Sequence, residues 1–429
     1  MTDPGATPLP APHTLYSARQ RWLFLGVLFL VSTSNFADRT VIAVLLEPIR
    51  LEFGVSDTML GLLSGLAFAL LYSALGVPVA RWADRGNRRV IVALAVATWS
   101  VMCTLCGMAQ TFWQLLLARM GVGAGEAGAT PPSQSLIIDY FPPEQRARAI
   151  AIFTAGASAG SLVGFMAGAQ IAAHSGWRAA FVMLGLPGIV LAVVAALVLR
   201  EPRAALPARA AGAAAESFAL TLRALWGKPT FRYTLIGLTL YGFFAYGVLT
   251  FVAAYMVRVL RVDMATVGYS YGALSVATAA LGTLGGGWLA DRLAQRNRAW
   301  LLMLPAAGLL LAFPPYLLGF VLHDFTLFMV LVSVGGVLLT GAIPPVFVAA
   351  HAVCGSARRA MAVSILLLFM MLVGSSLGPL AVGLVSDALR PAHGNAGLGH
   401  ALALLTLVML ACAACFWRGA RTLGADAED

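Results

Sequence analysis

Charged residues are scarce in this sequence, which argues against a soluble fold. Asp, Glu, Lys and Arg make up 11% of the 429 residues, whereas a soluble globular domain carries roughly 25%. Lysine is rarest, since Lys228 is the only one. The other basic residues form small clusters between apolar runs and do not follow one polar face. Nucleic acid is therefore not an expected partner.

Motifs for energy-consuming or covalent chemistry are also missing. No G-x-x-x-x-G-K-[ST] segment is present, so ATP is not the expected energy source. The six histidines fall in the first tail or at predicted loops and span ends, where they assemble no evident metal cluster. A membrane enzyme normally carries a nucleophile with a base, or a metal cluster, near one surface. The sequence shows neither and predicts no enzyme, no cofactor and no metal.

Long apolar runs dominate what is present. Hydrophobic residues make up 60% of the chain, and they recur in stretches of about 20, the length with which a helix crosses roughly 30 Å of hydrocarbon. Two Cys-x-x-Cys pairs lie inside such runs, where packing is the simpler role. The pattern predicts an all-α membrane protein with spans at 22–46, 58–80, 90–109, 113–139, 148–173, 178–199, 233–257, 265–290, 300–321, 325–350, 360–386 and 399–417.

The basic residues set the expected orientation. Of the 28 Lys and Arg residues, 21 fall in the tails and in the loops and span ends on their side, five in the opposite loops and span ends, and two in the interior of spans. The positive-inside rule therefore predicts that both termini are cytoplasmic. The arginine-rich composition suggests a bacterial source and thus the inner membrane. The expected units are a disordered tail (1–20), a six-helix bundle (21–199), a linker (200–232) that includes an amphipathic stretch at 217–226, a second bundle (233–417) and a tail (418–429).

The two halves of the sequence echo each other. Asp84-Arg85 follows the second span, and Asp291-Arg292 follows the eighth. A Pro-Pro pair at 131–132 in the fourth span is matched by another at 344–345 in the tenth. Parallel repeats of this kind predict two pseudo-symmetric six-helix bundles with a path between them.

Four charged residues fall inside predicted spans: Asp38, Arg39, Arg119 and Glu126. Such groups are costly in a bilayer, by about 2.5–3.5 kcal/mol each, and are functional candidates by default. Arg119 and Glu126 are almost two helical turns apart and share a face, which we expect to line a cavity. Adjacent residues diverge by about 100°, so Asp38 and Arg39 cannot point the same way.

Two interpretations of these charges stay open. They are either buried ion pairs that fix the helix register, or a working site. A carboxylate that alternates between dry and wet surroundings can bind and release a proton, so we expect Asp38 and Glu126 to exchange protons. Arg39 and Arg119 would modulate them, and Arg119 has the geometry to grip a phosphate or carboxylate. The expected substrate-binding residues, whose aromatic members have simple helix packing as the alternative, are Arg39, Arg119, Phe36, Thr130, Tyr241, Phe244 and Tyr246.

The chain resembles the major facilitator superfamily from Arg21 to Arg418. The Asp84-Arg85-Gly86-Asn87-Arg88-Arg89 loop is similar to the superfamily's signature, with Asn87 where glycine is usual, and Asp291-Arg292 is similar to its weaker copy. The resemblance implies the major facilitator fold with twelve transmembrane helices. It also implies a cytoplasmic gate of Asp84, Arg85, Arg88, Arg89, Asp291 and Arg292, in which Asp84 latches onto the start of span eleven. An ordinary topogenic loop is the alternative.

A narrower resemblance is to the Spinster-type transporters. Asn35-Phe36-Ala37-Asp38-Arg39 and the run from Gly121 to Ala127 carry it. It implies a secondary transporter that works by alternating access on a lysophospholipid or sphingoid-type lipid, with proton coupling in some members. The expected partners are that lipid-like substrate, protons and the bilayer, and the expected state is a monomer. The alternatives are a multidrug or small organic-anion carrier and a non-transporting lipid receptor.

Overall fold

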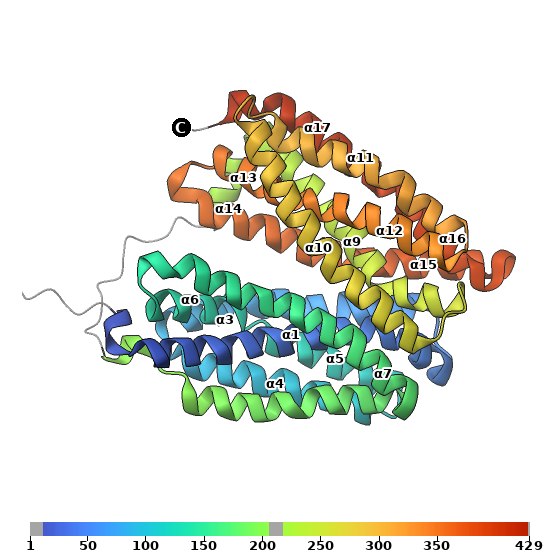
Figure 1. Cartoon of the computed structure of the whole chain (residues 1–429), viewed down its shortest axis with the longest axis horizontal. Coiled ribbons are helices and arrows are strands. Elements are labelled where there is room, and N and C mark those ends of the chain that lie inside the picture. The colour runs from blue at the N-terminus through green and yellow to red at the C-terminus, as the bar shows by residue number, and fades with distance from the viewer. Residues whose placement is uncertain (1–11, 206–217, 428–429) are drawn as a thin grey trace, which may run out of the picture.

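The computed structural model describes residues 12–205 and 218–427 and contains only helices within these ranges. Figure 1 shows two helical bodies, one built from the first half of the chain and one from the second. The first comprises α1 (Ala18–Phe53), α2 (Asp57–Gly61), α3 (Ala67–Arg85), α4 (Arg88–Met108), α5 (Phe112–Glu126), α6 (Thr130–Tyr140) and α7 (Pro143–Val198), with short turns η1 (Pro12–Leu15), η2 (Leu62–Leu66) and η3 (Pro202–Ala205).

The second body follows the predicted linker, of which residues 206–217 lie outside the described ranges. Of the amphipathic stretch expected at 217–226, residues 218–226 form α8, and residue 217 lies outside the described ranges. The remaining elements are α8 (Phe218–Trp226), α9 (Pro229–Arg258), α10 (Met264–Ala294), α11 (Trp300–Val321), α12 (Phe325–Gly341), α13 (Ile343–Val353), α14 (Gly355–Phe369), η4 (Met370–Ser375), α15 (Ser376–His393), η5 (Gly394–Ala396), α16 (Gly397–Leu405) and α17 (Leu407–Asp426).

These helices give the twelve predicted spans. Nine segments in the described part are long and apolar enough to cross a membrane. Two of the nine contain a reversal: α7 turns at Gly176, whose φ of 82° suits glycine, and the segment 361–426 turns at Gly394. The broken helix α5–α6 lies outside the nine and supplies the twelfth span. The predicted fold class is confirmed.

A stripe of glycines fixes how α1 sits against α7. Gly156, Gly160, Gly164 and Gly168 recur at a spacing of four along α7 and face α1. A Cβ at Gly164 would lie 2.6 Å from the carbonyl oxygen of Ala37, so only glycine allows this approach. Close helix contact through small residues is a common packing mode in membranes. It places the central part of α1, with its two charged residues, at a defined depth and rotation.

The two bodies touch at the end of the molecule that lies away from the chain termini. There α10 packs on α7 through Gly268 and Gly272, which face Phe165 and Met166. At the same end α2 packs on α15, where Gly61 meets the backbone of Pro379. Figure 1 shows the bodies converging at this end and diverging toward the C-terminus. The space between the bodies is therefore closed at this end, which we call the far end, and the opposite end, near the chain termini, is the terminus end.

Candidate substrate cavity and charged site

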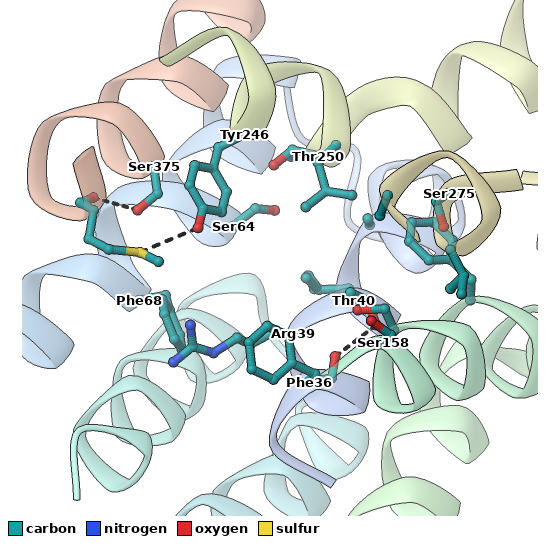
Figure 2. A pocket seen from close by; sticks show the side chains of 18 of the residues that line it. Phe36, Arg39, Thr40, Ser64, Phe68, Ser158, Tyr246, Thr250, Ser275 and Ser375 are labelled. Carbon is teal, nitrogen blue, oxygen red and sulfur yellow. Dashed lines mark hydrogen bonds between the residues drawn. The ribbon is translucent and has the colours of Figure 1, made fainter. Parts of the chain in front are cut away.

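A cavity of about 260 Å³ lies between the two bodies, near the middle of the helices. The first body contributes polar and aromatic residues from α1, η2, α3, α5 and α7, and the second contributes residues from α9, α10 and η4. Figure 2 shows Arg39 and Phe68 on one side, across from Tyr246 and Thr250 on the other. The lining includes Phe36, Arg39, Thr40, Ser64, Phe68, Arg119, Ser158, Tyr246, Thr250, Ser275 and Ser375.

Arg39 joins α1 to α5 across the first body. Its guanidinium is paired with the carboxylate of Glu126, which is fully buried. Three aromatic rings surround the guanidinium, with the centroids of Phe36, Phe68 and Tyr72 at 5.4, 5.1 and 4.8 Å from its carbon. Rings attract a cation through their negative faces. Arg39 is thus held between a carboxylate behind it and aromatic rings beside the cavity.

Arg119 lines the same cavity without a carboxylate partner. Its Nη1 donates to the backbone carbonyl of Asp38 at 3.2 Å, and its Nε has no hydrogen-bond partner. Within the described residues it forms no ion pair, although it is only 1% exposed. A buried guanidinium with unused donors is costly unless something negative approaches it. Arg119 is therefore a cavity-lining guanidinium that has no negative partner among the described residues and whose buried Nε donor is unused.

Asp38 points away from Arg39, into the helix packing of the first body. Its Oδ1 accepts a hydrogen bond from the Cys103 thiol on α4 at 3.3 Å. Its Oδ2 and the Oε1 of Glu126 have no hydrogen-bond partner among the described residues, and both are buried. Each of these two buried carboxyl groups thus has one oxygen with a hydrogen-bond partner and one without. Protonation of an oxygen without a partner would remove the cost of a buried negative charge.

The other predicted substrate-binding residues separate in space. Phe36 and Tyr246 line the main cavity, and the Tyr246 hydroxyl donates to the sulfur of Met371 at 3.4 Å. Phe244 is buried within the second body against Tyr316. Thr130 begins α6 and is not part of the cavity lining. Tyr241 lines a different pocket.

That pocket, here called the side pocket, holds about 180 Å³ inside the second body. It adjoins the main cavity because Leu249 and Ser275 line both. The polar part of its lining consists entirely of hydroxyl groups, from Tyr241, Tyr271, Ser275, Thr278, Tyr316 and Thr340.

An ion cluster joins the two bodies at the closed end, and we call Glu47, Asp57, Arg258 and Asp387 the interbundle cluster. Arg258 Nη2 contacts Glu47 at 2.6 Å, and its Nη1 contacts Asp57 at 2.7 Å. The Asp387 carboxylate accepts from the backbone N–H groups of Asp57 and Thr58 at 3.0 and 2.8 Å. Glu47, Asp57 and Arg258 are buried, with the Arg258 side chain 5% exposed, and Asp387 is half-buried. The cluster therefore ties α9 and α15 of one body to α1 and α2 of the other.

At the terminus end, Arg88 binds only within the first body among the described contacts. Its Nη2 contacts Asp139 at 2.7 Å, and its backbone N–H donates to Glu201 at 2.7 Å. Burial alone would raise the pKa of Glu201, but the hydrogen bonds and charge of Arg88 hold that pKa below its ordinary value.

The other predicted gate residues lie near this end. Arg85 is exposed and Arg89 half-buried, whereas the side chain of Asp84 lies outside what the structure describes. Asp291 lines a shallow surface hollow with Arg298 and Arg359. Arg292 lies over the ring of Trp288 at 4.4 Å.

Sequence reasoning missed the interbundle cluster and the role of Cys103. The residues of the interbundle cluster lie near helix ends, where charged residues are expected in any membrane protein. Their positions in the sequence therefore did not indicate that they pair across the two bodies. Cys103 has the profile of a small packing residue. Only its contact with Asp38 distinguishes it.

A sequence model of the Major Facilitator Superfamily matches residues 28–379. Among curated proteins, an "MFS-type efflux pump" of Mycolicibacterium smegmatis is 36% identical over 94% of this chain and 93% of its own length. "Protein spinster homolog 1" of Xenopus tropicalis is 26% identical over 85% of this chain and 72% of its own.

Among solved structures, a bacterial homolog of the human lysosomal transporter Spinster is similar throughout. Its inward-facing, unoccupied form superposes with a TM-score of 0.87 at 32% identity, covering 96% of this chain and 100% of the other. The inward-facing, occupied form gives a TM-score of 0.86 at the same identity.

Proposed function

We propose, from the premise that this chain belongs to the major facilitator superfamily, that it is a proton-coupled carrier of a single-chain anionic or zwitterionic lipid. The chain is a multi-pass membrane transporter with a Spinster-like fold. The substrate class we propose is a lysophospholipid or sphingoid-type lipid. We place the protein in a bacterial inner membrane as a monomer, with both termini in the cytoplasm.

The observation that carries this proposal is the unpaired Arg119 beside an aromatic-lined cavity. A phosphate in the cavity would give the Arg119 guanidinium the charged partner that it lacks, and the neighbouring Arg39 adds a second positive charge. The cavity volume of about 260 Å³ is near the lower limit of roughly 300–1,000 Å³ for small-molecule pockets. It suits a headgroup, while Phe36, Tyr246 and the apolar lining contact the start of the chain.

Proton coupling follows from the two carboxyl groups behind the arginines. Arg39 both pairs with Glu126 and lines the cavity. An anion that binds in the cavity attracts Arg39 and thereby weakens the Arg39–Glu126 ion pair. An unpaired buried Glu126 then takes up a proton, because a lone buried charge is unfavourable. Asp38, held by Cys103, supplies the second protonatable group. Substrate binding and protonation are thereby linked through one guanidinium.

Alternating access requires the two units, 21–199 and 233–417, to rock about the cavity. The interbundle cluster closes one side in the present state and must break for the other state to form. At the opposite side we propose that Asp84, Arg85, Arg88, Arg89, Asp291 and Arg292 form the gate, by resemblance to the superfamily signature.

A second candidate is export of small amphiphilic molecules, which the efflux-pump relative favours. The same cavity would serve, because an organic anion or an amphiphilic drug meets the same arginines and rings. The receptor alternative is weaker, since a charged site between two bodies closed at one end serves movement better than static binding.

Transport of a labelled lysophospholipid into proteoliposomes, with and without an imposed pH gradient, tests the proposal. We expect wild type to accumulate lipid with the gradient and Glu126→Gln to lose this drive while remaining folded. Glu144→Gln is the matched control, because Glu144 is an exposed carboxylate at the start of α7.

Gradient-driven uptake retained by Glu126→Gln would overturn the assignment of Glu126. Absence of movement of any single-chain lipid by folded wild type would overturn the lipid assignment in favour of the export candidate.

A further inference from the structure

The side pocket has a lining unlike that of the main cavity. Tyr241, Tyr271 and Tyr316 reach it from α9, α10 and α11. Among the described residues, none of the three phenol oxygens has a hydrogen-bond partner, and none is fully buried by its neighbours. The hydroxyl groups are therefore open to the pocket.

The remaining hydroxyls present only lone pairs to the pocket. Ser275 donates to the carbonyl of Gly272 at 2.9 Å and Thr278 to that of Leu274 at 2.9 Å. Thr340 donates to the carbonyl of Gly336 at 2.8 Å. A hydroxyl whose proton is already bound can only accept. The pocket is thus rich in acceptor oxygens and aromatic side chains.

No Asp, Glu, Lys or Arg is part of the lining among the described residues. An anion would find no positive charge there. An alkyl chain would leave three phenol groups without partners, which is costly in a dry site. A cation meets aromatic side chains and oxygen lone pairs, the kinds of group that bind ammonium groups in aromatic cages.

The packing holds this lining in place. Gly335 lets the ring of Tyr316 lie against α12, since a Cβ there would come within 2.8 Å of the ring. On its other side Tyr316 contacts Phe244, with ring centroids 5.1 Å apart. A fixed cage loses less entropy on binding than a flexible one.

We propose that the side pocket binds the ammonium end of an amphiphilic substrate. The ammonium group belongs either to a zwitterionic headgroup, whose phosphate lies at Arg119 in the adjoining cavity, or to a separate cationic amphiphile. The inference rests on the proposed function only in treating the main cavity as the substrate site. It assigns Tyr241, Tyr271 and Tyr316 to recognition of positive charge.

Equilibrium binding to purified protein tests the assignment. The probes are radiolabelled lysophosphatidylcholine and lysophosphatidylglycerol with the same acyl chain, and hexadecyltrimethylammonium as a competitor. We expect wild type to prefer the choline lipid. Tyr241→Leu should weaken choline-lipid binding by roughly tenfold and leave binding of the glycerol lipid nearly unchanged.

Two further variants separate recognition from structure. Tyr241→Phe keeps the ring and should retain most of the choline preference. Tyr269→Leu removes a tyrosine that is 51% exposed on α10 and should match wild type. Competition by hexadecyltrimethylammonium that depends on Tyr241 identifies a free cation as ligand, and its absence alongside choline preference identifies the zwitterionic headgroup.

Equal loss of both lipids in Tyr241→Leu, equal affinities in wild type, or no binding of any ammonium ligand by folded wild type would overturn the proposal. Transport can prove independent of the pH gradient while choline-lipid binding still depends on Tyr241. Conversely, binding can prove independent of Tyr241 while transport is still driven by the pH gradient. The two proposals therefore fail separately.

Discussion

The two bundles have the same architecture but opposite polar character near the middle of the membrane. The first carries Asp38, Arg39, Arg119 and Glu126 in its helices, all close together. The second lines the shared cavity with the hydroxyl groups of Tyr246, Thr250, Ser275 and Ser375. Under the two proposals above, proton exchange and phosphate binding belong to the first repeat, and ammonium binding belongs to the second.

The largest effect is expected from a substitution that removes the charge of Arg119 from the first bundle. Arg119→Gln should lower substrate transport about 100-fold, because a phosphate would lose a charged, potentially bidentate partner. Arg119→Lys should recover part of it, since the charge remains and the planar fork is lost. Initial uptake rates in proteoliposomes measure both, with Arg148→Gln at an exposed position as control. Unchanged uptake in Arg119→Gln would move the anion site elsewhere.

A second test breaks the contact between the bundles. Arg258→Gln leaves Asp57 buried without its cation and leaves Glu47 paired with Arg50 alone. Removing one partner of a buried ion pair costs about 3–5 kcal/mol in comparable sites. The closed far end should then open more often. To measure this, Thr250→Cys is introduced into a background without the native cysteines. A membrane-impermeant maleimide added at the far end should label this cysteine more than tenfold faster in Arg258→Gln than in the protein that keeps Arg258.

Arg390→Gln, at an exposed position on the same bundle, controls for charge loss. Equal labelling rates in the Arg258 and Arg390 variants would mean that the cluster does not hold the far end closed.

A third test concerns the close packing that positions the charges. Gly164→Val should destabilise the protein by about 1–3 kcal/mol, because the new side chain meets the α1 backbone at Ala37. Gly26→Val is the matched variant, since a Cβ at Gly26 meets nothing within 4 Å. Thermal unfolding of the two proteins gives the comparison, and similar melting temperatures would contradict the packing argument.

The smallest expected effect lies at the terminus end of the first bundle. The pKa of Glu201 is held low by Arg88, so its stabilising contribution is complete above the ordinary glutamate pKa and is lost as the pH falls through the lowered value. Glu201→Gln should cost about 1 kcal/mol at neutral pH, and its melting temperature should approach that of wild type on acidification. A gap independent of pH would show that charge is not the cause.

The sequence predicted the architecture well because hydropathy and loop charge depend on local composition. It also identified Asp38, Arg39, Arg119 and Glu126, since a charge inside an apolar run needs no tertiary information to stand out. Their partners were not predictable. Whether Arg39 or Asp38 faces Glu126 depends on the rotation of α1 against α5, which the glycine stripe of α7 helps to set.

The remaining misses have the same origin. Tyr241 and Phe244 are neighbours on one helix, yet one lines the side pocket and the other is packed against Tyr316. Arg258 lies at the end of a span like any interfacial arginine, and only the assembled fold brings it to Asp57. Pairing between distant segments is therefore the information that composition and spacing lacked.

The cap that Asp387 places on the start of α2 makes the backbone itself a reporter of conformation. The amide hydrogens of Asp57 and Thr58 are bonded to a carboxylate of the opposite body, so they lose this partner whenever the far end opens. Helix-terminal amides without a cap exchange readily with water. Deuterium uptake by a peptide spanning 55–60 would therefore measure, in an unmodified and unlabelled protein, the fraction of time that the far end spends open.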